Sequence, residues 1–152
     1  MPEWVDLLDS ANQKYDPSTS GLSATNVKTA LDELAQGLSG GVVWLSTFYP
    51  GLPTADLLMA SMVAPAGGAV FPADLSDSRL SAKVAATAET VFLIKKGAVQ
   101  VGSITVAAAG TTGVFAMASE TTLAAGEVLD VYAPSTPDGT LADVSMTIVG
   151  SR

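Results

Sequence analysis

The sequence predicts a mainly β protein: an antiparallel β-sandwich of the jelly-roll type, preceded by a short α-helical stem and an extended N-terminal arm. Two observations lead to this class. Beyond residue 42 the chain breaks into short alternating runs separated by Gly, Pro, Ser and Asp, which is typical of antiparallel strands joined by tight loops. Hydrophobic residues make up 48% of the chain but aromatic residues only 6%, and this small-residue composition favours thin, closely packed sheets.

Changes in composition divide the 152 residues into three segments. Residues 1–22 form an N-terminal attachment arm, residues 23–41 a short coiled-coil helix with a Gly hinge, and residues 42–152 the β-sandwich domain. This length suits one main domain with an appendage.

The arm carries Trp4, Leu7 and Leu8 at helical spacing, with acidic residues facing elsewhere. Two interpretations remain open. The segment is either a short helix that packs on its own chain, or an anchor that docks a larger assembly through a Trp-centred apolar patch.

The helix is indicated by Val27, Leu31, Leu34 and Leu38, which recur at steps of four, three and four, the spacing of a coiled-coil seam. Ser23 is the expected N-cap. Gly37 and the run Ser39-Gly40-Gly41 are expected to end the helix. Because so short a helix is marginal alone in water, its apolar stripe needs a partner, which is either the rest of the chain or copies of the same helix.

Alternation and turn residues predict the strands of the β-domain. They are expected at residues 42–49, 57–64, 80–86, 90–96, 99–107, 114–118, 128–132 and 141–149.

Charge and composition exclude several function classes. The net charge of −8 with seven basic residues argues against nucleic-acid binding and against adsorption to anionic membranes. The adjacent pair Lys95 and Lys96 is interpreted as a solvated turn. There is no Cys and no His, so thiolate metal sites and the commonest general base are missing. No secretion signal or membrane span is recognised, so the protein is expected to be soluble and made in a cytoplasm.

Carboxylates are the remaining catalytic material. Asp74 with Asp77, and Asp138 with Asp143, lie in expected loops, where we interpret them as turn and capping residues rather than as an acid pair or a calcium site. No catalytic residue, metal or cofactor is therefore expected.

One aromatic group is a candidate ligand platform. Trp44, Phe48 and Tyr49 could stack on a sugar, but the alternation that places Trp44 and Phe48 on one face favours a core position.

Two stretches resemble a known family. The run YDPSTSGLSATNVKTALDEL, residues 15–34, resembles an element that precedes helical stems in tailed-bacteriophage virion appendages. The closing run AAGEVLDVYAPSTPDGTLADVSMTIVGSR, residues 124–152, resembles the last strands of small phage fibre and capsid-fibre head domains.

The resemblance implies a non-enzymatic structural protein of the virion. The arm would attach it to a capsid or other virion protein, the helix would make it a homotrimer, and the β-domain would project outward. A head fibre or capsid decoration protein is favoured. The alternatives are a tail-fibre or receptor-binding tip, which would bind host-surface glycans through loops 72–79 and 134–141, and a carbohydrate-binding module. A polysaccharide depolymerase is disfavoured because the chain has no His.

Overall fold

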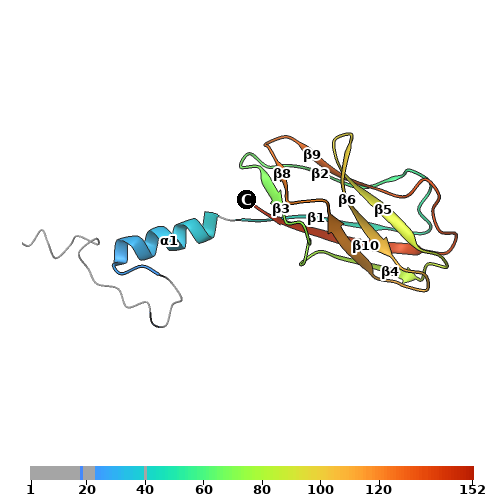
Figure 1. The fold of residues 1–152 in the computed structure, drawn as a ribbon, viewed down its shortest axis with the longest axis horizontal. Helices are drawn as coiled ribbons and strands as arrows, with labels where there is room; N and C mark the ends of the chain where they lie inside the picture. The colour runs from blue at the N-terminus through green and yellow to red at the C-terminus, as the bar shows by residue number, and fades with distance from the viewer. Residues whose placement is uncertain (1–17, 19–22, 40) are drawn as a thin grey trace, which may run out of the picture. The chain divides into compact units, whose positions relative to one another are not determined.

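The computed structural model describes residue 18, residues 23–39 and residues 41–152, and for residues 35–39 the backbone alone. The chain divides into two compact units, Met1–Gly41 and Val42–Arg152. The first unit holds the helix α1, Val27–Ser39, and the second holds the strands (Figure 1).

All the strands in the described residues pair antiparallel, which confirms the predicted mainly β, antiparallel class. In chain order they are β1 Val42–Tyr49, β2 Leu58–Val63, β3 Ala69–Phe71, β4 Arg79–Val84, β5 Thr90–Lys96, β6 Val99–Val106, β7 Gly113–Met117, β8 Thr121–Leu123, β9 Val128–Tyr132 and β10 Ala142–Ser151.

The first five-stranded sheet is built around β10. Along one edge β10 pairs with the whole of β1, from Val42 opposite Ser151 to Tyr49 opposite Val144. It also pairs with β4 and, at its C-terminal end, with β3. The short strand β8 then pairs with β3. The long strand β10 therefore ties the start of the β-domain to its end.

The second five-stranded sheet has the order β2-β9-β5-β6-β7. The hairpin of β5 and β6 lies at its centre, turning at Gly97, whose φ of 57° suits glycine. A register shift between Leu58 and Ala60 interrupts the pairing of β2 with β9. The hydrogen-bonded strands of this sheet appear side by side in Figure 1.

Side chains from both sheets form one hydrophobic core. Phe71 and Ile148 of the first sheet and Phe92 and Ile104 of the second are completely buried within the same cluster. Alternation within the strands explains this placement, because successive side chains point to opposite faces of a sheet. On β6, for example, Ile104 and Val106 are buried while Thr105 between them is only half-buried.

The glycine at position 150 lets the backbone of β3 and the Phe71 ring approach β10 closely. A Cβ placed on Gly150 would lie 2.7 Å from the Val70 carbonyl oxygen and 2.8 Å from a ring carbon of Phe71. Both distances are too short for carbon contacts, so the neighbouring backbone and ring would have to move.

We therefore predict that Gly150→Ala destabilises the β-domain by about 1–3 kcal/mol, the usual cost of overpacking a dense core. Gly139→Ala is the matched control, because nothing lies within 4 Å of a Cβ at that position. Urea unfolding followed by circular dichroism measures the difference. Equal midpoints for the two variants would contradict the close packing at Gly150.

The strand predictions differ from the structure at two places. Strands β3 and β8 were not predicted, because three-residue runs are too short to show alternation. They form because each pairs with the other, and β3 also pairs with β10. Within residues 80–86, Leu80, Ala82, Val84 and Ala86 alternate with polar or small residues and were expected to share one face, but Val84 is 46% exposed at the end of β4 while the other three are buried.

Candidate functional site

The N-terminal end of α1 is built from local capping contacts. The Asn26 side-chain oxygen accepts a hydrogen bond from the Thr29 backbone N–H at 2.9 Å, and the Asn26 carbonyl accepts one from Ala30 N–H at 3.0 Å. Asn26 is therefore the N-cap, and the expectation of Ser23 was wrong. Instead, the Ser23 backbone N–H donates to the Glu33 carboxylate at 2.9 Å, so the chain from Ser23 to Asn26 folds back alongside the helix.

The predicted seam lies on this helix, and two of its three described side chains are open to solvent. Leu31 is 57% exposed and Leu34 is 50% exposed, while Val27 is half-buried. The backbone of Leu38 is helical, and its side chain lies outside the described part. Exposed leucines at seam spacing leave apolar area that a second helix could cover.

The polar side of the helix carries an exposed ion pair. The Lys28 ammonium lies 2.7 Å from the Asp32 carboxylate one turn later. Exposed pairs of this kind stabilise an isolated helix only slightly, because water screens the charges. The stability of α1 therefore depends on what covers its apolar stripe rather than on its polar surface.

The proposed attachment residues Trp4, Leu7 and Leu8 lie outside the described residues. Their docking role stays a prediction from the sequence.

Trp44 and Phe48 share a face of β1, as alternation predicted, but that face is not the core. Trp44 is 67% exposed and Phe48 is 52% exposed, so the expectation of a core position was wrong. The inward face of β1 instead carries Leu45 and Tyr49. Alternation indicates which residues share a face, whereas the pairing of β1 with β10 decides which face meets the core.

Asp138 holds two loops together. One carboxylate oxygen accepts hydrogen bonds from the Thr87 N–H, the Thr87 hydroxyl and the Ala88 N–H, at 2.9, 2.6 and 2.9 Å. The other oxygen accepts from the Thr140 N–H, the Thr140 hydroxyl and the Leu141 N–H, at 2.8, 2.7 and 2.9 Å. These donors, led by the hydroxyls of Thr87 and Thr140, hold the pKa of Asp138 far below its usual range. A carboxylate so fully occupied is suited to structure and not to proton transfer.

Asp74 and Asp143 each accept one backbone hydrogen bond. Asp74 accepts a hydrogen bond from the Ser76 N–H at 3.3 Å, and Asp143 accepts one from the Gly51 N–H at 2.8 Å. Across the described residues, no group of three or more acidic side chains is arranged to hold a metal ion. The interpretation of Asp74 as a turn residue fits its contact with Ser76. For Asp143 that interpretation was wrong, because Asp143 lies within β10 and its partner Gly51 is 92 residues away along the chain.

Lys95 and Lys96, at the end of β5, make side-chain contacts that a solvated turn would lack. The Lys96 ammonium lies 2.7 Å from the Glu127 carboxylate and donates to the Thr122 carbonyl at 3.0 Å. The Lys95 ammonium lies 4.6 Å from the centre of the Tyr132 ring. Both lysines are half-buried, so their interpretation as a solvated turn was wrong. The pairing of β5 with β9, which no local pattern specifies, creates these contacts.

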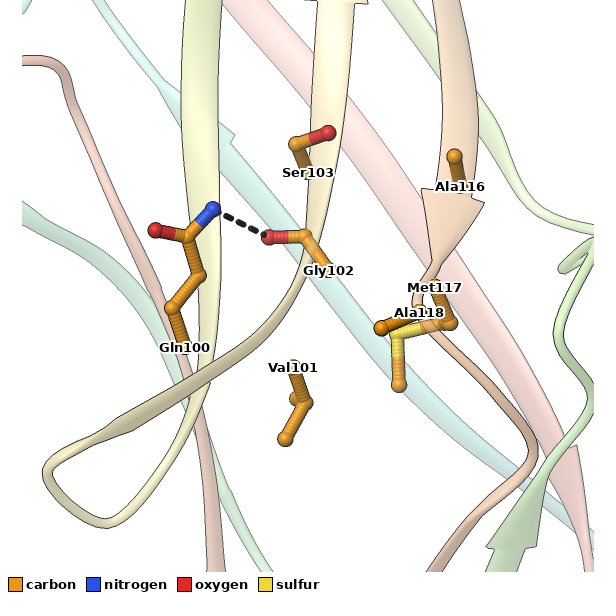
Figure 2. A pocket seen from close by; sticks show the side chains of 7 residues that line it. All are labelled: Gln100, Val101, Gly102, Ser103, Ala116, Met117 and Ala118. Atoms are coloured by element: carbon orange, nitrogen blue, oxygen red, sulfur yellow. Dashed lines mark hydrogen bonds between the residues drawn. The ribbon is translucent and has the colours of Figure 1, made fainter.

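A shallow hollow of about 430 Å³ lies between β6 and β7 (Figure 2). It is lined by Gln100, Val101, Gly102, Ser103, Ala116, Met117 and Ala118. The Gln100 amide donates to the Gly102 carbonyl at 3.4 Å, the hydrogen bond drawn in Figure 2. The lining of the hollow contains no titratable side chain, so it provides no general acid or base.

Comparison of the chain with protein-family models, with curated proteins and with solved structures finds no match. In the described part of the chain, α1 is too short to span a bilayer, and no other helix has the length and apolar character to do so.

Proposed function

We propose that this chain is a non-enzymatic structural protein of a tailed-bacteriophage virion, a homotrimeric head fibre or capsid decoration protein. Its N-terminal arm attaches it to a capsid or other virion protein, and its β-domain projects outward. The observation that carries the proposal is the exposed Leu31–Leu34 stripe on α1, which sits at coiled-coil spacing. The two sequence resemblances connect that stem with phage appendages.

We also propose that the β-domain is a jelly-roll sandwich. If β3 and β4 are treated as one interrupted strand beside β10, and β7 and β8 as another that links the two sheets, the orders are β1-β10-β3/β4-β7/β8 and β2-β9-β5-β6, with β7 pairing at the β6 edge. This interleaving of early and late strands is what two Greek keys produce. The single core shared by the two sheets supports the same proposal.

The non-enzymatic part of the proposal is supported by chemistry. The chain has no His and no Cys, and the Asp138 carboxylate is fully hydrogen-bonded. The hollow between β6 and β7 adds no reactive group.

Deleting residues 1–22 tests the attachment role. We expect the truncated protein to keep its β-sheet circular dichroism, because the core cluster found among the described residues is built from residues 42–152. We expect it to lose incorporation into virus particles, measured by co-sedimentation with particles that lack the native protein. Trp4→Ala should weaken incorporation in the same direction, and Glu3→Gln is the control. Normal incorporation of the truncated protein would contradict an arm-based anchor.

The second candidate is a glycan-binding tip or carbohydrate-binding module. The exposed pair Trp44 and Phe48, with Ser46 between them on one strand face, favours it, because flat aromatic rings and hydroxyls suit sugar rings. Titration of host-wall oligosaccharides followed by tryptophan fluorescence tests this candidate.

A further inference from the structure

One face of the β-domain exposes its aromatic residues. We define the β1 face as the outward side chains Val42, Trp44, Ser46 and Phe48 of β1, together with Thr147 and Val149 of β10. Trp44 lies opposite Val149 in the register, and Ser46 lies opposite Thr147, with their hydroxyls 3.0 Å apart in the second pair.

The β1 face is apolar at its centre. Val42 is 62% exposed, Trp44 67% and Phe48 52%, although all three lie within eight residues of one strand. Among the described aromatic residues, Trp44 and Phe48 are the exposed ones, since the others are buried or half-buried. Exposed apolar patches rimmed by polar groups mark association surfaces, and Trp is enriched where binding energy concentrates.

Charge separates this face from the rest of the molecule. The chain carries 15 acidic and seven basic residues, yet the outward positions from Val42 to Phe48 and from Ser145 to Ser151 hold no acidic side chain. The nearest carboxylate along β10 is that of Asp143, which is hydrogen-bonded to the Gly51 N–H. Beside the face, β4 adds Lys83, whose ammonium lies 5.5 Å from the Phe48 ring.

This distribution of charge indicates what kind of partner the β1 face can bind. Copies of a chain with net charge −8 repel one another wherever their acidic surfaces meet. The side chains of the β1 face are themselves uncharged, and Asp77 lines a hollow at its edge together with Val42 and Val149. Association through this face keeps the other carboxylates outward and in solvent, where repulsion is screened. The cores of protein interfaces are likewise poor in charged residues.

The covalent connection favours β1 over the other exposed strands. Only Gly40 and Gly41 separate the end of α1 at Ser39 from Val42, and three Cα steps span at most about 11 Å. Three helices that meet along their seam therefore bring three copies of Val42 close to the same axis. Val42, at the start of β1, is then the residue of each β-domain that the chain ties to this axis.

We propose that the β1 face is the surface through which three copies of the β-domain pack against one another. This inference rests on the homotrimer proposed above. It also supplies association energy that the short seam lacks, because a helix of 13 residues holds fewer than two full heptads.

The test compares full-length variants by light scattering at micromolar concentration. We expect Trp44→Asp/Phe48→Asp to fall from a trimer to the 15.3 kDa monomer, because charges then replace the centre of the face. Val99→Asp/Val114→Asp is the matched control, since both residues are exposed apolar side chains outside the β1 face, at 66% and 72%. Circular dichroism checks that both double variants keep their β-sheets. If Trp44→Asp/Phe48→Asp misfolds, the milder variant Trp44→Ser replaces it in the light-scattering comparison.

Tryptophan emission gives a second measurement. In a Trp4→Phe background Trp44 is the remaining tryptophan, so its emission should shift to longer wavelength when the trimer is diluted into monomers. A trimer whose Trp44 emission does not shift on dilution would overturn the inference.

The outcomes separate the two proposals. If the unchanged chain is a monomer, the homotrimer fails and the inference fails with it. If the unchanged chain and Trp44→Asp/Phe48→Asp are both trimers, the homotrimer stands and the β1 face is not its interface. Loss of oligosaccharide binding by that trimeric variant would assign the face to glycans instead.

Discussion

Replacing Leu31 and Leu34 with Asp is expected to convert the protein from a trimer to a monomer at micromolar concentration. Both side chains are at least half exposed on α1, so the change costs the isolated helix little. In a trimer the seam would bury both. Each buried leucine contributes about 1.5–3 kcal/mol, and a trimer would lose two per copy. The six carboxylates placed in the seam would also repel one another.

Size-exclusion chromatography with light scattering measures this change. The unchanged chain should have three times the mass of the 15.3 kDa protomer, and the Leu31→Asp/Leu34→Asp variant should have the mass of a single protomer. Val99→Asp/Val114→Asp serves as the control, because it places the same charges on exposed positions of β6 and β7. A trimeric Leu31→Asp/Leu34→Asp variant would show that the seam is dispensable, and a monomeric unchanged chain would remove the trimer altogether.

Asp138→Asn is expected to lower the melting temperature at neutral pH by several degrees. The carboxylate joins the loop at Thr87 and Ala88 to the turn at Thr140 and Leu141 through three donors on each oxygen. An amide keeps one acceptor oxygen and turns an NH₂ group toward the other donors. Those donors then lose their partner, and unsatisfied donors are costly.

The effect should depend on pH in one direction. The pKa of Asp138 is lowered in the folded protein, so its carboxylate stabilises the fold fully above the unfolded value of about 3.9. That contribution is lost as the pH falls through the folded pKa. The difference in melting temperature between the unchanged chain and Asp138→Asn should therefore be constant near neutral pH and shrink below about pH 4.

Thermal unfolding between pH 7 and pH 3, followed by circular dichroism, checks this expectation. Asp74→Asn is the matched control, because Asp74 accepts a single 3.3 Å hydrogen bond in a loop and its loss should change little. Identical melting temperatures for Asp138→Asn and the unchanged chain at pH 7 would show that the hydrogen bonds of Asp138 between the two loops do not stabilise the fold. A difference that stays the same at pH 3 would rule out the carboxylate charge as its cause.

The candidate site could be predicted from the sequence in part. The stripe of Val27, Leu31 and Leu34 was found because helical spacing is a local property, and α1 carries these residues. The N-cap was placed three residues too early, because Ser23 and Asn26 are both good capping residues and the sequence does not rank them. The contacts of Asp138 were missed because Thr87 lies 51 residues away along the chain.

Local patterns thus determined the mainly antiparallel β class, the longer strands and the position of one amphipathic helix, because alternation, helical spacing and turn residues act over only a few positions. The tertiary structure alone decided the rest. Strands β3 and β8 form through their pairing, and Trp44 and Phe48 face away from the core. Lys95 contacts the Tyr132 ring, and Lys96 pairs with Glu127. These outcomes depend on which distant strands become neighbours, and a strand pattern does not specify its partner or the face that meets the core.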